Sequence, residues 1–271
     1  MKYHLHENGW TVIIDEDIIT LSSEDIKQCA RFAVENMVVV FEQQSLTPED
    51  QMRFCTTIGN VPIIKSERSK HIALNDNILR VTAQKNEYGE EGLFGHKAAL
   101  DWHANRPSNK QRDPLIWLYG AEGTVGSRTS WINNILSYQD LDEDFKQEIA
   151  DIEVFCGYKK GNYSHSEYFV EHVNRENAMS LVKTNDSGKT GLFFPFLQIF
   201  EFKNHNEEDF TRIMKRLTDH ILQEKYVYHH DWKDGDVVLS EQWLSIHKRW
   251  EFQDMENRVL HRIAFNYDNV Y

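Results

Sequence analysis

Cysteine is scarce in this sequence, and the few that occur are not arranged to bind zinc or to form a disulfide framework. The 271 residues contain three cysteines, Cys29, Cys55 and Cys156, at wide spacing and with no CxxC pair. Zinc ribbons and disulfide-dependent secreted domains need closely spaced pairs. We therefore expect reduced thiols and a cytoplasmic protein.

The sequence also lacks an excess of positive charge and a long hydrophobic run. The chain has 30 Lys and Arg against 43 Asp and Glu, which gives a formal net charge of −13. Phosphate backbones and anionic membranes are bound by basic surfaces, so neither a nucleic acid nor a membrane is an expected partner. No apolar run approaches the roughly 20 residues of a membrane-spanning helix, and the N-terminal residues do not resemble a signal peptide. A small buried pocket for an anion remains compatible with this charge.

The apolar residues that are present suffice for one large core. Hydrophobic residues make up 40% of the chain and aromatic residues 12%, so residues 1–271 are predicted to form a single domain. Capping signals with helical periodicity alternate with short β-type runs, and no repeat or linker interrupts them. We predict an α+β fold in which helices flank a sandwich or jelly roll. The predicted helices cover residues 22–35, 47–58, 133–138, 142–150 and 207–224.

Two polar segments stand apart from these elements. Residues 84–98 are polar and contain glycine, which is typical of a mobile flap over an active site. Residues 158–190 are rich in His, Asn, Tyr and Lys, and we interpret them as an insertion or active-site loop because β-type runs resume after it.

The C-terminal stretch places two arginines on one side of a predicted strand. Arg258, Leu260 and Arg262 alternate, so a strand directs both guanidinium groups to the same face. A short loop joins this strand to a preceding one that contains His247. Two cations on an otherwise apolar strand are explained by an anionic ligand beside a metal that the histidine binds.

A second histidine, His103, lies in the segment Trp102-His103-Ala104-Asn105. A mononuclear iron site needs two histidines and one oxygen donor, with other positions open to substrate and oxygen. The usual first half of such a site is His-x-Asp or His-x-Glu, in which both side chains point the same way. His103 and Asn105 have this spacing.

Three motifs in this order resemble the Fe(II)/2-oxoglutarate-dependent oxygenases of the TauD/TfdA superfamily. They are Trp102-His103-Ala-Asn105, then Gly126-Ser-Arg-Thr129-Ser-Trp131, then His247 followed by Arg258 and Arg262. The segment from Trp232 to Phe252 is most similar to the carbapenem-synthase and clavaminate-synthase branch. The resemblance extends from about Val38 to near the C-terminus. It implies a double-stranded β-helix, or jelly roll, with flanking helices.

The resemblance also implies roles for individual residues. His103, His247 and the residue at position 105 would be the iron ligands. Thr129 and Arg262 would hold the distal carboxylate of 2-oxoglutarate. Arg258 would lie near the other carboxylate or the iron-bound oxygens, and so take part in catalysis with the two histidines. Arg128, next to Thr129 on the opposite strand face, should point away from the co-substrate.

Asn105 departs from the family pattern, which has a carboxylate at this position. Asparagine is neutral and a weaker ligand, so iron affinity should fall. Asn105 could still coordinate or hold a water that does, Asp101 could supply the carboxylate from the other side of His103, or chloride could fill the position as in halogenating members. A degenerate, inactive site is a fourth outcome.

The function implied by the resemblance is oxidation of an unactivated C–H bond in a small polar metabolite such as an amino-acid derivative. Fe(II) and O2 would be required, and 2-oxoglutarate would be converted to succinate and CO2. The alternatives are a halogenase that uses the open position at Asn105, and a non-catalytic protein that binds 2-oxoglutarate with a degenerate metal site.

Overall fold

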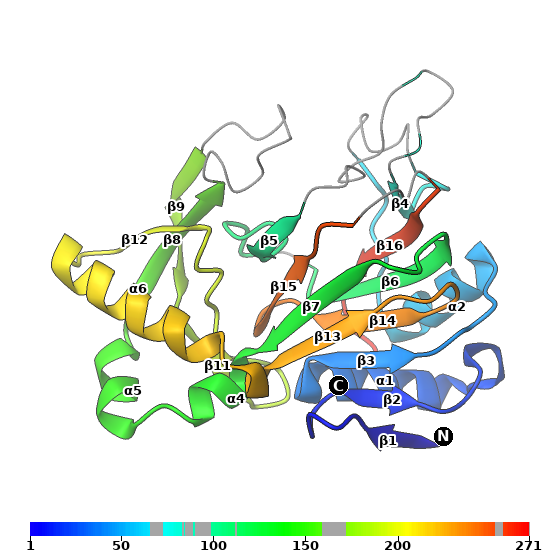
Figure 1. Cartoon of the computed structure of the whole chain (residues 1–271), viewed down its shortest axis with the longest axis horizontal. Helices are drawn as coiled ribbons and strands as arrows, with labels where there is room; N and C mark the ends of the chain where they lie inside the picture. Colours follow the sequence, from blue (N-terminus) through cyan, green and yellow to red (C-terminus); the bar gives the residue numbers. More distant parts are fainter. Residues whose placement is uncertain are drawn as a thin grey trace.

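The computed structural model describes residues 1–65, 73–82, 84, 89, 99–111, 113–158, 172–252 and 257–270. Within these ranges two sheets form the centre of the molecule, and helices cover one of them (Figure 1). The predicted flap at residues 84–98 lies almost entirely outside the described residues, as do residues 159–171 of the predicted insertion.

The larger central sheet has seven strands, and neighbours are antiparallel except for the parallel pair β2 and β3. In spatial order its strands are β1 (Tyr3–Leu5), β2 (Val12–Ile14), β3 (Val38–Phe41), β14 (Val237–Glu241), β6 (Leu115–Glu122), β16 (Val259–Phe265) and β4 (Leu79–Thr82).

The second central sheet has four antiparallel strands, in the order β13 (Val227–Asp231), β7 (Arg128–Asn133), β15 (Ser245–Arg249) and β5 (Leu100–His103). Side chains from both sheets form one buried cluster, which includes Trp131 from the second sheet and Val238 and Leu260 from the first. The two sheets therefore pack face to face, as the predicted jelly roll requires.

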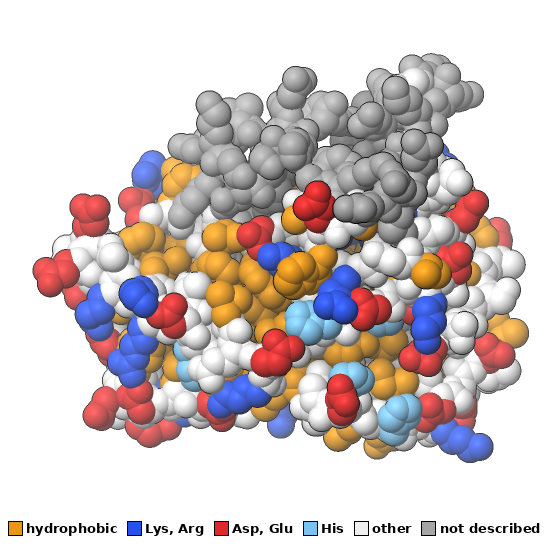
Figure 2. Space-filling model, in the orientation of Figure 1, with side chains coloured by type: hydrophobic (Ala, Val, Ile, Leu, Met, Phe, Trp, Pro, Cys, Tyr) orange, Lys and Arg blue, Asp and Glu red, His pale blue; other side chains and the backbone are white. Residues whose placement is uncertain are grey.

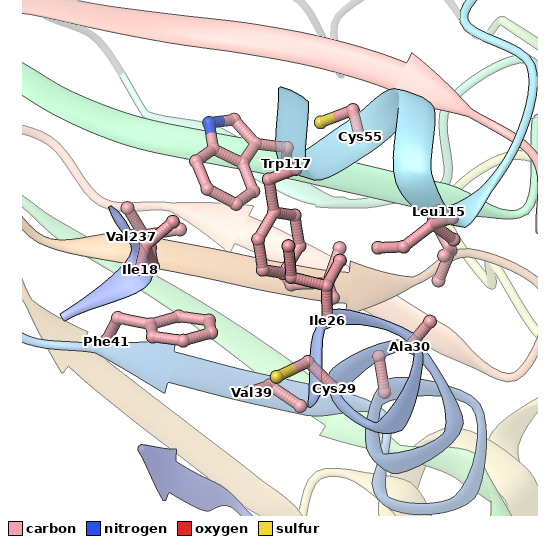
Figure 3. Packing of buried hydrophobic residues seen from close by; sticks show 14 of the residues in the cluster. Ile18, Ile26, Cys29, Ala30, Val39, Phe41, Cys55, Leu115, Trp117 and Val237 are labelled. Carbon is pink, nitrogen blue, oxygen red and sulfur yellow. The ribbon is translucent and has the colours of Figure 1, made fainter. Parts of the chain in front are cut away.

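Helices α1 (Ser23–Asn36) and α2 (Pro48–Ile58) cover the outer face of the larger sheet. Both begin with a reciprocal capping box, Ser22 with Asp25 and Thr47 with Asp50, and each box satisfies backbone N–H groups that a helix start leaves open. Figure 3 shows side chains of both helices packed against this sheet, with Cys55 beside Trp117. The sequence prediction of these two helices is confirmed.

A second group of elements packs beside the smaller sheet (Figure 1). It contains the three-stranded sheet β12–β8–β9 and a two-stranded hairpin, together with three helices. Their bounds are β8 (Glu153–Tyr158), β9 (His172–Ser180), β10 (Val182–Thr184), β11 (Thr190–Leu192), β12 (Ile199–Phe202), α4 (Asn134–Gln139), α5 (Glu143–Ile149) and α6 (Glu207–Ile221). A 3-10 turn at Glu224–Tyr226 follows α6, and another at Ile18–Thr20 packs beside α2 on the larger sheet.

This group corrects one expectation about the polar segment 158–190. Residues 172–184 are not a loop, because β9 pairs with β8 and β10 pairs with β11. The polar composition misled the prediction, since several of the polar side chains of β9 are solvent-exposed while the backbone is fully extended. Helix α6 also ends at Ile221, before the predicted residue 224.

On the face shown in Figure 2, acidic and basic side chains of the described residues are interspersed. None of the helices in the described part of the chain is long and apolar enough to cross a bilayer.

Candidate active site

A cavity of about 330 Å³ lies between the two central sheets. Most of its wall comes from β4, β6 and β16 of the larger sheet and from β5, β7 and β15 of the smaller one, and Tyr158 at the end of the neighbouring strand β8 also lines it. The apolar part of the wall is formed by Leu79, Val81, Leu100, Ile116, Leu118 and Leu260. The polar part contains the six residues to which the resemblance gave a role in metal or co-substrate binding, namely His103, Asn105, Thr129, His247, Arg258 and Arg262.

The two histidines face each other across neighbouring strands. His103 is the last residue of β5 and pairs in register with His247 in β15, and their ring centroids are 4.2 Å apart. The Nδ1 atom of His103 is 2.6 Å from the carbonyl oxygen of Asp101. A carbonyl can only accept, so Nδ1 carries the proton and Nε2 keeps its lone pair, the arrangement typical of metal-binding histidine. Burial lowers the pKa of His103 to about 4, which keeps the ring neutral at pH 7.

Asn105 reaches the cavity, whereas Asp101 does not line it. The Asn105 side-chain nitrogen donates to Oε1 of Gln242 at 2.7 Å. The Asp101 carboxylate accepts from the backbone of Trp102 and pairs with Lys248 at 3.0 Å, and its side chain is 47% exposed. In the described part of the chain, no cluster of three or more His, Cys, Asp or Glu residues is placed to hold a metal.

Arg258 is fully buried and has an unsatisfied donor. Its side chain is 1% exposed, and Nε donates to Oγ of Ser127 at 3.0 Å. The guanidinium lies over the ring of Phe252, 4.9 Å from its centroid. Nη2 has no hydrogen-bond partner among the described residues. Burial lowers the pKa of Arg258 to about 10, so the group stays charged at pH 7 in surroundings that disfavour the charge.

Arg262 lies in a different electrostatic environment from Arg258. Burial, and next the positive charge of Arg106, lower the pKa of Arg262 to about 10, while Asp113 and Tyr158 act in the opposite direction. Arg106 is itself largely exposed and pairs weakly with Asp113 at 3.7 Å. The alternation predicted for β16 is confirmed, since Arg258, Leu260 and Arg262 all line the cavity.

The hydroxyl of Thr129 is oriented by a buried indole. Nε1 of Trp232 donates to Oγ1 of Thr129 at 2.9 Å. Because the oxygen accepts this bond, the hydroxyl proton of Thr129 remains available to donate to a ligand. Arg128 points away from the cavity and pairs with Asp231 at 2.6 Å on the surface, as the sequence predicted.

Three polar residues of the site were not predicted. Gln198 is fully buried and binds both backbone groups of Ala104, Oε1 to its N–H at 2.8 Å and Nε2 to its carbonyl at 3.2 Å. Gln242 binds Asn105, and Arg249 lines the cavity with its guanidinium over Phe252. Burial, and next the charge of Arg258, lower the pKa of Arg249 to about 9. The sequence could have predicted that Arg249 faces the cavity, because it lies two residues after His247 on the same strand. No sequence pattern around Gln198 or Gln242 indicated that either belongs to the site.

These residues form a donor set that fits a divalent metal ion with modest affinity. His103 and His247 provide two neutral imidazoles, and Asn105 provides a neutral amide oxygen. Imidazole and oxygen donors suit iron. The missing carboxylate leaves the pocket more positive than a two-histidine, one-carboxylate site.

Comparison with known proteins agrees with this geometry. The family model of the taurine catabolism dioxygenase TauD, TfdA family matches residues 13–264. The alpha-ketoglutarate-dependent 2,4-dichlorophenoxyacetate dioxygenase of Burkholderia sp. (strain RASC) is 22% identical over 254 residues, which cover 89% of this chain and 86% of that protein. Pentalenolactone F synthase of Streptomyces avermitilis is 20% identical over 271 residues, covering 92% and 88%.

Solved structures share the fold. The crystal structure of AAD-2 in complex with Mn(II) and N-oxalylglycine has a TM-score of 0.78 at 16% identity and covers 97% of this chain and 96% of that one. A putative alpha-ketoglutarate-dependent taurine dioxygenase from Burkholderia xenovorans has a TM-score of 0.74 at 15% identity, covering 95% and 86%. These likenesses confirm the predicted jelly-roll core. The chain therefore belongs to the TauD, TfdA family, and is an oxidoreductase of the alpha-ketoglutarate-dependent dioxygenase class, which uses Fe(II), 2-oxoglutarate and O2.

Proposed function

We propose that the protein oxidises an unactivated C–H bond of a small anionic metabolite, by hydroxylation or a related oxidation, and releases succinate and CO2. The observation that carries this proposal is the buried Arg258, whose Nη2 lacks a partner in the described chain, in the cavity that also contains His103 and His247. A buried cation with an open donor is unfavourable unless an anion reaches it. A carboxylate of 2-oxoglutarate is an anion of the required shape.

We assign the metal to His103, His247 and the side-chain oxygen of Asn105. When bound, Fe(II) supplies the activation of O2 and the oxidative decarboxylation of the 2-oxo acid. The chain presents neutral imidazoles, fixes the ring of His103 through the Asp101 carbonyl, and surrounds the reacting bond with apolar side chains. Asp101 is not assigned to the metal, because its carboxylate pairs with Lys248.

For the co-substrate, the neighbours of the two arginines favour exchanging the roles that the resemblance implied. Arg258 is bonded to Ser127, which lies directly before β7 and two residues before Thr129. We therefore propose that Arg258 and the hydroxyl of Thr129 hold the distal carboxylate. Arg262, with Arg106 as its main charged neighbour, then faces the substrate.

An anionic substrate follows from this placement of Arg262. The cavity walls contain no Asp or Glu among the described residues, while four arginines line it. A carboxylate-bearing compound, such as an amino-acid derivative, would supply the opposite charge. The relatives named for 2,4-dichlorophenoxyacetate act on a compound that carries such a group.

The three cysteines are buried thiols, which supports the expected cytoplasmic setting.

The proposal is tested by adding Fe(II) and 2-oxoglutarate without oxygen. We expect a weak visible charge-transfer absorption, and then succinate release when oxygen and a set of small carboxylates are supplied. The proposal would be refuted if the wild-type protein gave neither signal and also bound neither metal nor 2-oxoglutarate.

The neutral side chain of Asn105 specifically favours two alternatives. A halogenase would place chloride in the position that the missing acid leaves, and would give a chlorinated product, or a brominated one when bromide replaces chloride in the assay. A non-catalytic 2-oxoglutarate-binding protein would show the same calorimetric affinity for 2-oxoglutarate with and without metal, and no succinate.

A further inference from the structure

The hydrogen bond between Asn105 and Gln242 fixes which atom the residue at position 105 can offer to a metal. The Asn105 nitrogen is 2.7 Å from Oε1 of Gln242. With the nitrogen committed to that bond, the amide presents its oxygen on the other side. An aspartate here would accept from Gln242 only after the Gln242 amide had turned its nitrogen toward position 105, whereas the two amides pair as they stand.

Gln242 is held in place by its own surroundings. Its side chain is 2% exposed, and its backbone N–H donates to the carbonyl of Pro114 at 2.8 Å. It lies in the turn between β14 and β15, where the Glu241 carboxylate accepts from the next two backbone N–H groups. This turn leads directly into the strand that carries His247, so the amide partner of Asn105 and the second histidine belong to one rigid unit.

The backbone beside Asn105 is also fixed. The two bonds from Gln198 hold both polar groups of Ala104. Asn105 is therefore positioned from two sides, by Gln198 through the preceding peptide groups and by Gln242 through its own amide. Such double support is typical of residues that orient a ligand.

The electrostatics of this site differ from those of a site with a carboxylate. A divalent metal held by two imidazoles and an amide retains its full charge, and the described cavity wall adds arginines but no acid. The negative charge needed beside the metal then comes from the bound 2-oxo acid itself. Each ligand favours the other, and by linkage the effect is the same in both directions.

We propose that the Asn105–Gln242 amide pair makes metal loading depend on 2-oxoglutarate, with Gln242 as the positioning residue. This inference rests on the proposed function. In the absence of 2-oxoglutarate the protein binds metal weakly, and the complete set of metal and co-substrate forms together. The site is emptied of metal when the co-substrate is scarce.

The test is a Mn(II) titration followed by the electron paramagnetic resonance signal of free Mn(II), with and without 2-oxoglutarate. In wild-type protein, 2-oxoglutarate should tighten Mn(II) binding by a factor toward the upper end of the usual coupling range of about 5- to 150-fold. Asn105→Asp should bind Mn(II) alone about 10-fold more tightly than wild type, a free-energy change of ~1.4 kcal/mol. In that variant the coupling factor should fall by a similar amount.

Gln242 is tested by a matched pair of variants. Gln242→Met removes the acceptor at similar size, and should weaken Mn(II) binding in the presence of 2-oxoglutarate about 3- to 10-fold, in line with one hydrogen bond. Gln242→Glu keeps an acceptor for Asn105 and should restore at least wild-type affinity. Gln147→Met, on the exposed face of α5, is the control for the chemical change and should bind as wild type does.

The outcomes separate the inference from the function on which it rests. Equal coupling in wild type and Asn105→Asp would overturn the inference alone, and so would wild-type Mn(II) affinity in a folded Gln242→Met. If the thermal unfolding profile shows Gln242→Met to be misfolded, the comparison of wild type, Asn105→Asp and Gln242→Glu decides. Absence of Mn(II) and 2-oxoglutarate binding in every folded variant would overturn the proposed function as well.

Discussion

Replacing Arg258 by methionine should make the ligand-free protein more stable while abolishing its response to 2-oxoglutarate. Methionine keeps an unbranched apolar side chain of similar length and removes the charge. The unsatisfied buried donor costs about 1–3 kcal/mol, and the desolvation of the cation adds to this. The loss of the Ser127 bond and of the contact with Phe252 opposes the gain by about 1 kcal/mol each. Ser127 keeps its bond to the carbonyl of Thr124, so no new unsatisfied group is created.

The net expectation is a gain of about 1–2 kcal/mol in the free energy of unfolding. For a protein of this size that corresponds to a rise in Tm of roughly 2–6 °C. In wild type with Mn(II), 2-oxoglutarate at 100 times its Kd should add about 2.7 kcal/mol. The same addition should leave the Tm of Arg258→Met unchanged, because the guanidinium that we assign to the distal carboxylate is gone.

The assay is thermal unfolding of both proteins with Mn(II), in the presence and absence of 2-oxoglutarate. Arg216→Met is the matched control, because Arg216 also lies over an aromatic ring, Phe145 at 3.7 Å, but its side chain is 47% exposed. It should not raise Tm and should keep the full ligand response. A ligand-free Arg258→Met less stable than wild type, or one that still responds fully to 2-oxoglutarate, would refute the reasoning.

Three further predictions concern single contacts. Burial lowers the pKa of His261 to about 4 from its ordinary 6.5; the unfolded state binds the proton first, so stability should fall as pH drops from about 6.5 toward 4. His261→Gln should reduce that loss, by up to about 3 kcal/mol in urea unfolding. Gln198→Leu leaves both backbone groups of Ala104 without their partner and should cost about 2–4 kcal/mol of unfolding free energy. Trp232→Phe removes the donor to Thr129 and should weaken calorimetric 2-oxoglutarate affinity about 3- to 10-fold.

Each of these changes has a control elsewhere in the chain. His205→Gln and Gln147→Leu make the same exchanges at exposed positions and should leave stability nearly unchanged at all pH values tested. Trp250→Phe removes an indole bond to Ser130, the neighbour of Thr129 on the same strand but outside the cavity wall, and should keep 2-oxoglutarate affinity. A control that behaves like its partner variant would contradict the corresponding explanation.

The local signals in the sequence were sufficient for the helices that cover the larger sheet. The capping boxes at Ser22 and Thr47 involve residues three apart, so the sequence carries the whole interaction. The alternation of Arg258 and Arg262 is equally local, because a strand sends alternate side chains to one face. This explains why the predicted side of β16 is confirmed.

The supporting contacts of the site could not be predicted in this way. Gln198 and Ala104 are 94 positions apart, and Asn105 and Gln242 are 137 apart. Nothing next to either glutamine distinguishes it from a surface residue until the sheets bring the partners together. The strands within residues 172–184 were missed for a related reason, since their pairing partners, and not their own composition, make them extended.

The position of the cavity between two sheets has a consequence for how ligands protect the protein. Most of its wall comes from six strands of the two central sheets, which are dispersed along the chain from β4 to β16. A partly folded chain that formed only the larger sheet would lack both histidines, and one that formed only the smaller sheet would lack Arg258 and Arg262. Either would have little affinity for the co-substrate. Bound co-substrate therefore opposes any opening that unfolds or separates either sheet, and slowed amide exchange should spread over both sheets while the edge strand β1 continues to exchange freely.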